Sequence, residues 1–210
     1  MIGLIILKAN ELNFRNVYHK LCYISKAANF KAVMKDWPNS DEATGVIAYG
    51  YIDHTAGLTF EVLACASLKE NNRLLVFEGN ENHSVKYRFE SVSDCEIFFV
   101  GNENLRKKFA DKIEMIDEGY TATDGVLKVR DITMIDECRS QEYPDDVLVI
   151  LTRGNNQPEG CWVRCEGIKE NYIYGILLNE PNADFTVHMG QLVKFGIAKN
   201  NDRIICVAVY

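Results

Sequence analysis

The chain has 210 residues, of which 47% are hydrophobic and 25% are charged, a balance typical of a globular protein with its own core. No apolar run approaches the roughly 20 residues of a membrane-spanning helix, so we expect no membrane segment. The formal net charge of −7 and the lack of a basic stripe disfavour nucleic acid as a direct partner.

The N-terminal region predicts a strand and then a helix. Residues 2–7 are apolar but lack the basic leader and longer core of a secretory signal, so we interpret them as a buried strand of a cytoplasmic protein. Asn10 can cap a helix that finishes before Pro38. Apolar residues recur at helical spacing between these positions, at Phe14, Val17, Tyr18, Leu21, Ile24 and Ala28.

Residues 44–101 change to the period of two that is typical of strands, and short turns between the runs favour an antiparallel meander. A second helix follows, with Asn102 as its cap and Gly119 at its end. Its buried stripe comprises Leu105, Phe109, Ile113 and Ile116. Residues 125–135 then suggest one more strand, and the polar stretch after it suggests a domain boundary after residue 138.

The remaining segment, residues 139–210, predicts five short strands joined mostly by tight turns. A sheet of this kind removes its edges by curling into a small barrel or half-barrel. Gly175 in mid-strand indicates a bend or a close approach of backbone. The expected fold class is α+β: an N-terminal antiparallel sheet with two helices over residues 1–138, then a small curled sheet or half-barrel.

Acidic residues gather in one segment, because residues 111–146 hold eleven acids and four bases. A solvated helix end and linker would explain this pattern. Alternatively, the segment could form an acidic surface that docks a basic protein, with Asp136, Glu137, Asp145 and Asp146 as contact residues.

Two more places suggest partner-binding residues. Trp162 and Arg164 share a strand face, and tryptophan with arginine is a residue pair typical of interface hot spots. A tryptophan buried in the core would give the same sequence pattern. Glu180, Asp184 and His188 are spaced four apart, but Pro181 and the β-prone residues 185–187 argue against the helix that would align them as a metal or acid–base site.

The seven cysteines form no CxxC pair, and we expect neither a metal site nor a cofactor. No nucleophile elbow, phosphate-binding loop or dinucleotide fingerprint is present, so no catalytic residue is predicted.

Residues 144–195 resemble a group of uncharacterised bacterial domains related to immunity proteins of polymorphic toxin systems, either immunity family thirty-three or a relative of it. The matching residues are Trp162-Val163, Gly175, Leu177-Leu178-Asn179-Glu180-Pro181, Phe185, His188, Gly190, Val193 and Phe195. The resemblance implies a small α+β cytoplasmic protein that binds a cognate toxin without catalysis.

Together these observations predict a non-enzymatic binding protein that docks a protein partner, for example a basic toxin. A small-molecule-binding or regulatory module is the alternative, and convergent polar groups in a concave apolar site would favour it. An enzyme that uses Glu180, Asp184 or His188 is a third possibility, and it requires these side chains to converge.

Overall fold

The computed structural model describes residues 7–70 and 73–209 and divides the chain into two compact units, 1–121 and 122–210. The strand expected over residues 2–7 lies outside the described residues except for Leu7, which begins β1. Among the described residues, no helix combines the length and the apolar composition needed to cross a bilayer.

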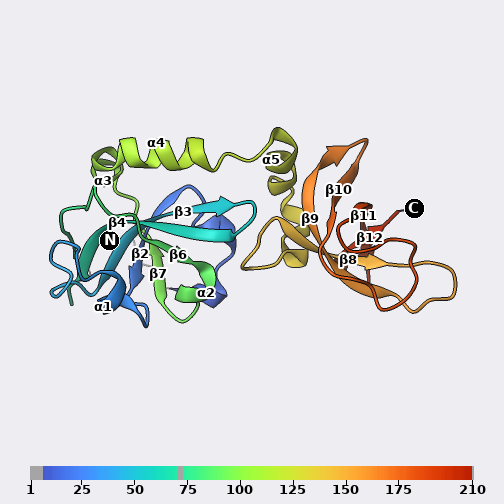
Figure 1. The fold of residues 1–210 in the computed structure, drawn as a ribbon, viewed down its shortest axis with the longest axis horizontal. Coiled ribbons are helices and arrows are strands. Elements are labelled where there is room, and N and C mark those ends of the chain that lie inside the picture. The colour runs from blue at the N-terminus through green and yellow to red at the C-terminus, as the bar shows by residue number, and fades with distance from the viewer. Residues whose placement is uncertain (1–6, 71–72, 210) are drawn as a thin grey trace. The chain divides into compact units, whose positions relative to one another are not determined.

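The first unit contains a seven-stranded antiparallel sheet in the order β1-β7-β2-β3-β4-β5, with β6 paired to β4 (Figure 1). Its strands are β1 (Leu7–Lys8), β2 (Lys20–Ser25), β3 (Gly45–Asp53), β4 (Gly57–Leu68), β5 (Leu74–Val76), β6 (Lys86–Arg88) and β7 (Glu96–Phe99). The sheet is antiparallel, as expected, but it is not a simple meander, because β7 lies between β1 and β2.

Both faces of this sheet are covered, so β3 and β4 are buried along almost their whole length. The helical elements of the unit are η1 (Ala9–Glu11), η2 (Phe14–Asn16), α1 (Phe30–Val33), α2 (Phe89–Val92), α3 (Glu103–Lys108) and α4 (Ala110–Gly119). Figure 1 shows α4 alongside β3. Two separate apolar clusters lie on the two faces, and Trp37 belongs to one and Phe109 to the other.

The predicted first helix is wrong. Residues 20–25 form the strand β2, with only 3-10 turns before it and the four-residue α1 after it. Leu21 and Tyr23 pack in one apolar cluster, whereas Cys22 and Ile24 pack in the other. A strand that is buried on both faces reads as a continuous apolar run, which periodicity alone cannot distinguish from a helix.

The predicted second helix is confirmed, although it is divided into α3 and α4. The Asn102 side chain accepts a hydrogen bond from the backbone N–H of Leu105 at 3.0 Å, as an N-cap should. Ile113 and Ile116 are buried against the sheet, and α4 ends at Gly119. The local signals of this helix therefore agree with its tertiary environment.

The strand expected over residues 125–135 is also wrong, because this region forms α5 (Asp124–Arg130) and η3 (Thr133–Cys138). Thr123 caps α5, and Val126 and Val129 form its buried side at a spacing of three. The structure groups these elements with the second unit, since α5 packs on β9 and η3 packs on β12. The division of the chain thus falls after residue 121, before the boundary expected after residue 138.

The second unit is a closed five-stranded barrel in the order β10-β11-β12-β8-β9. The five expected strands are present as β8 (Asp146–Leu151), β9 (Glu159–Lys169), β10 (Tyr172–Leu177), β11 (Leu192–Asn200) and β12 (Arg203–Ala208). The sequence left open a small barrel, a half-barrel or a curled sheet. Parallel pairing of β12 with β8 closes the barrel, at Cys206 opposite Val149 and Val207 opposite Ile150.

Gly175 lies where the expected close approach occurs. The β9–β10 register shifts between Tyr174 and Gly175, and a Cβ at position 175 would lie 2.2 Å from the carbonyl oxygen of Arg164. Only glycine allows the two backbones this separation.

Candidate functional site

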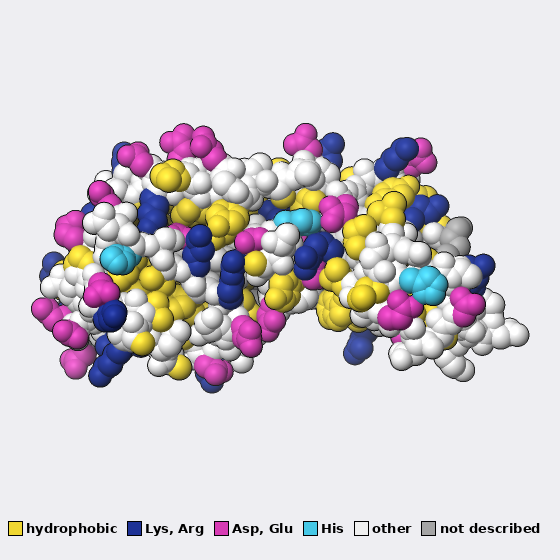
Figure 2. Space-filling view, in the orientation of Figure 1, with side chains coloured by type: hydrophobic (Ala, Val, Ile, Leu, Met, Phe, Trp, Pro, Cys, Tyr) yellow, Lys and Arg dark blue, Asp and Glu magenta, His cyan; other side chains and the backbone are white. Residues whose placement is uncertain are grey.

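The outer surface of the barrel carries apolar side chains on neighbouring strands. Leu148 of β8 lies opposite Trp162 of β9, and Ile176 of β10 lies opposite Leu192 of β11. Their chain neighbours point into the barrel, so these four side chains point outward. Trp162 is 38% exposed and Leu192 is 60% exposed. We call these four residues the barrel face, and Figure 2 shows hydrophobic side chains at the surface of this unit.

Arg164 lies on the same side of β9 as Trp162, as the alternation predicts, but its guanidinium group is engaged within the protein. Its Nε donates to Asp146 Oδ1 at 2.7 Å and its Nη2 donates to Asp146 Oδ2 at 2.9 Å. The hydrogen bonds to Asp146 raise the pKa of Arg164. Its guanidinium also lies 5.8 Å from the ring centre of Tyr143. Arg164 therefore supports the barrel face rather than offering a free charge.

Asp145 and Arg130 form a buried ion pair in which each side chain is 3% exposed. The guanidinium donates twice, from Nε to Oδ1 at 2.8 Å and from Nη2 to Oδ2 at 2.7 Å. This pair joins α5 to the residue just before β8. Since a buried carboxylate cannot contact a partner, the prediction that Asp145 and Asp146 form an acidic docking surface is wrong.

The other two acids proposed in that segment differ from each other. Asp136 accepts a hydrogen bond from Arg139 Nε at 3.2 Å, and its side chain is only 15% exposed. Glu137 is exposed. Glu137 is thus the one predicted contact residue of this segment whose side chain is at the surface.

The loop between β10 and β11, residues 178–191, closes one end of the barrel and is tied to β9. The Asn179 Oδ1 atom accepts a hydrogen bond from the backbone N–H of Trp162 at 2.8 Å. Phe185 is fully buried among the side chains of the barrel interior. Gly190 has a φ of +84°, and its N–H donates to the Leu177 carbonyl at 2.8 Å. These contacts give the residues that carry the family resemblance a structural role.

Glu180 and His188 are brought together in this loop. Glu180 Oε1 lies 2.7 Å from His188 Nδ1, and Glu180 Oε2 accepts a hydrogen bond from the Met189 N–H at 2.9 Å. Both side chains are more than half exposed. Asp184 does not join them, because its Oδ1 accepts from the Thr186 N–H at 2.8 Å. The described residues contain no group of three His, Cys, Asp or Glu side chains that could hold a metal ion.

The Glu180–His188 pair predicts a pH dependence. The hydrogen bond to Glu180 raises the pKa of His188, and the hydrogen bond from His188 lowers the pKa of Glu180. The charged pair is therefore complete between the lowered pKa of Glu180 and the raised pKa of His188. It is lost as pH rises through the pKa of His188 or falls through that of Glu180. In a titration followed by NMR of the imidazole, Glu180→Gln should lower the pKa of His188.

Asp184→Asn is the matched control for this titration, because Asp184 also raises the pKa of His188, but as a lesser cause than Glu180. It should therefore lower that pKa less than Glu180→Gln does. An unchanged His188 pKa in Glu180→Gln would show that the two side chains are not paired in solution.

The first unit contains a buried polar cluster that the sequence analysis missed. The Glu61 side chain is 4% exposed on β4 and accepts a hydrogen bond from Ser84 Oγ at 2.6 Å. Lys86 Nζ and Lys112 Nζ lie 3.9 Å and 3.7 Å from its two oxygens. Nearby in the same cluster, Tyr49 donates to Asp117 of α4 at 2.9 Å. In the sequence, this cluster is indicated by one acidic residue, Glu61, within the otherwise apolar run of β4.

Comparisons of the chain with protein-family models, curated proteins and solved structures found no match. The resemblance to immunity proteins therefore remains an expectation that rests on the sequence around Leu177–Pro181.

Proposed function

We propose that the protein is a non-enzymatic binding protein that docks a protein partner on the barrel face, with Trp162 as the central contact. The observation that carries this proposal is the distribution of exposed apolar side chains. Nine of the twelve large hydrophobic residues that are exposed in the described part of the chain belong to the second unit, although it is the smaller one. Three of the nine, Leu148, Trp162 and Leu192, belong to the barrel face. Clustered exposed apolar groups mark interaction sites more often than scattered ones do.

The arrangement around Trp162 resembles the anatomy of an interface. The indole is held on a rigid strand whose backbone is bonded to Asn179 and paired with β8 and β10. The Arg164–Asp146 pair and the Glu180–His188 pair provide polar groups near it in the same strands and loop. Hot spots combine an aromatic anchor with a surrounding polar rim in this way.

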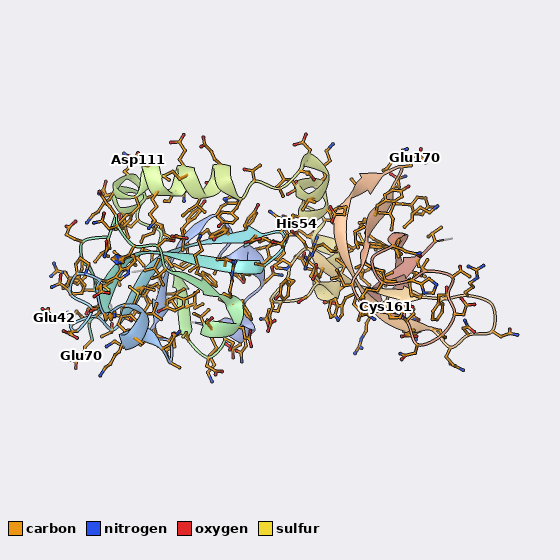
Figure 3. All side chains as sticks on the ribbon, viewed as in Figure 1. Glu42, His54, Glu70, Asp111, Cys161 and Glu170 are labelled. Carbon is orange, nitrogen blue, oxygen red and sulfur yellow. The ribbon has the colours of Figure 1, made fainter. Side chains whose placement is uncertain are left out.

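Two surface depressions of the first unit have a lining that favours a protein partner over a small ligand. One has a volume of about 580 Å³ and is lined by six charged residues together with Ala110 and Ile113. Another, of about 520 Å³, is lined mainly by polar and charged side chains, including Glu42, whose position Figure 3 labels. Small-molecule sites are instead mostly apolar and enclosed.

The kind of partner follows from charge and from the resemblance. A chain with a net charge of −7 associates most rapidly with a basic protein, particularly at low salt. The resemblance of residues 177–181 to immunity proteins makes that partner a basic toxin produced by the same bacterium. Binding would block the toxin without any chemical step in this protein.

The test is retention of a partner by wild type and by Trp162→Ala, first from lysate of the source organism at low salt and then with the purified partner. Truncating a central tryptophan typically costs about 2 kcal/mol or more in binding, so Kd should rise at least ~30-fold. Tyr172→Ala is the matched control, because Tyr172 is an exposed aromatic on the far end of β10. Its Kd should change by less than about threefold.

Equal binding by wild type and Trp162→Ala would exclude the barrel face as the interface. The toxin assignment has its own readout: growth of cells that produce the partner should be restored by wild type and not by Trp162→Ala. If the partner does not impair growth, the docking function would still stand, but the immunity assignment would be wrong.

The small-molecule alternative has one observation in its favour. Glu61 Oε2 is buried and accepts no hydrogen bond from the described residues. A metabolite that raises the melting temperature of wild type but not of Glu61→Gln would support a ligand at this cluster.

A further inference from the structure

Two cysteines that are distant in sequence meet where η3 packs on β12. Cys138 is the last residue of η3, and its thiol donates to the carbonyl oxygen of Ile204 at 3.5 Å. Cys206 lies two residues after Ile204 on β12, and its side chain points into the barrel. Cys138 packs against the apolar cluster that contains Cys206, so this packing and the contact with Ile204 bring the two thiols close together.

The two thiols have different accessibility and acidity. Cys138 is partly exposed, whereas Cys206 is fully buried. Hydrogen bonding of the Cys206 thiol to the thiolate form lowers the pKa of Cys138 to about 7, despite partial burial. The Cys206 N–H and Arg139 lower this pKa further, and Glu137 opposes them. The hydrogen bond with Cys138, together with burial, raises the pKa of Cys206.

Cys138 differs in this respect from the other six cysteines, for each of which the pKa is raised. Burial raises the pKa of Cys22 to about 12 and that of Cys65 to about 11. Thiols of this kind stay protonated and inert near neutral pH. Cys138 alone combines partial exposure, stabilisation of the thiolate and a second thiol packed nearby.

We propose that Cys138 and Cys206 form an oxidisable dithiol site, in which Cys138 attacks a peroxide and Cys206 resolves the product as an intramolecular disulfide. Accessible thiolates next to a resolving thiol are the ones that peroxides oxidise selectively. This inference is independent of the proposed partner.

The reaction balances with hydrogen peroxide as the oxidant. The Cys138 thiolate attacks one peroxide oxygen, so that an S–O bond forms, the O–O bond breaks and hydroxide leaves, taking a proton to give water. The Cys206 sulfur then attacks the Cys138 sulfenic sulfur: the S–S bond forms, the S–O bond breaks, and the departing hydroxide takes the Cys206 proton. Two thiols lose two electrons, and one peroxide becomes two waters.

The first step prepares the second. A principal reason that Cys206 resists ionisation is the neighbouring Cys138 thiolate, through its hydrogen bond and its negative charge. Conversion of that thiolate to a neutral sulfenic acid removes the charge, so Cys206 can lose its proton more readily. Cys165 also lies close enough to influence Cys206, and it is therefore the competing partner for a disulfide.

The test treats the folded full-length protein with about one equivalent of hydrogen peroxide near pH 7 and then blocks the remaining thiols with an alkylating agent. After digestion by trypsin, Cys138 lies in the peptide of residues 131–139 and Cys206 in that of residues 204–210. We expect these two peptides to be joined, the intact mass to fall by about 2 Da and a thiol reductant to reverse both changes.

Three variants define the outcome. Cys206→Ser should stop the link and let a dimedone-reactive sulfenic acid accumulate on Cys138, whereas Cys138→Ser should abolish both products. Cys161→Ser is the matched control, because Cys161 is a buried barrel cysteine on β9 that Figure 3 labels, and the 138–206 link should form in it as in wild type.

Alkylation of the untreated protein gives a second measurement that does not need a disulfide. Cys138 should react first, with a rate that is half-maximal near pH 7. Absence of the 131–139/204–210 link, or a link through Cys165 instead, would overturn the proposal. So would modification of Cys138 no faster than that of the buried cysteines.

Discussion

Replacing Asp145 by asparagine is expected to lower the free energy of unfolding of the second unit by about 3–5 kcal/mol. The change keeps the shape of the side chain and removes only its charge. Arg130 would then remain buried, with 3% exposure, opposite a neutral group. Breaking a buried ion pair by removing one of its charges is far more costly than the loss of an exposed ion pair.

The measurement is chemical denaturation followed by the fluorescence of Trp162, in a Trp37→Phe background so that the signal reports the second unit alone. Glu137→Gln is the matched control, because it removes an acid from the same segment but from an exposed position. Its effect should lie within about 0.5 kcal/mol. Similar small effects from both variants would mean that the Arg130–Asp145 pair is not formed in solution.

A double replacement separates the cost of a broken pair from the value of the pair itself. Arg130→Met with Asp145→Leu removes both charges and leaves apolar groups of similar size. Such replacements are often neutral or stabilising, so the double variant should recover most of the stability lost in Asp145→Asn. This result would identify the pair as a device that fixes α5 on the barrel rather than a net source of stability.

Replacing Phe185 by alanine should lower the free energy of unfolding of the second unit by about 3–5 kcal/mol. The Phe185 ring is fully buried in the barrel interior, although the residue belongs to the loop between β10 and β11. Its removal would leave a cavity at the end of the barrel, and the surrounding strands can close such a cavity only in part.

Phe185→Leu retains most of the volume and should cost less than about 1.5 kcal/mol. Met189→Ala is the matched control in the same loop, because the Met189 side chain is 61% exposed, and its effect should lie within about 0.5 kcal/mol. The same fluorescence-detected denaturation measures all three. A small effect of Phe185→Ala would show that the loop does not close the barrel, and the residues behind the family resemblance would then need another explanation.

The sequence predicted best those elements whose signals are local. Asn102, the apolar spacing of Ile113 and Ile116, and Gly119 define one helix, because capping and amphipathic spacing act within a few residues. The five strands of the second unit could be read from their turns, and the alternation of β9 placed Trp162 and Arg164 on one face. The close approach of the β9 and β10 backbones at Gly175 could likewise be predicted from a glycine in mid-strand.

The errors came where burial on both faces or long-range packing decides the structure. Leu21 to Ile24 read as part of a helix because both faces of β2 are covered. Thr123 and the spacing of Val126 and Val129 indicated a helix, but their apolar run was interpreted as a strand. Because α5 and η3 pack on the barrel, the first unit ends after residue 121 and not after residue 138.

The composition and local patterns of this chain by themselves determined its α+β class, its second helix and the five strands of its C-terminal sheet. Only the tertiary structure decided that the sheet closes through a parallel pair, that Asp145 and Asp146 are buried counterions, and that Cys138 meets Cys206. The physical reason is range: capping, turns and alternation depend on neighbours in the chain. The partner of a charge or a thiol depends instead on which distant strand folding brings beside it.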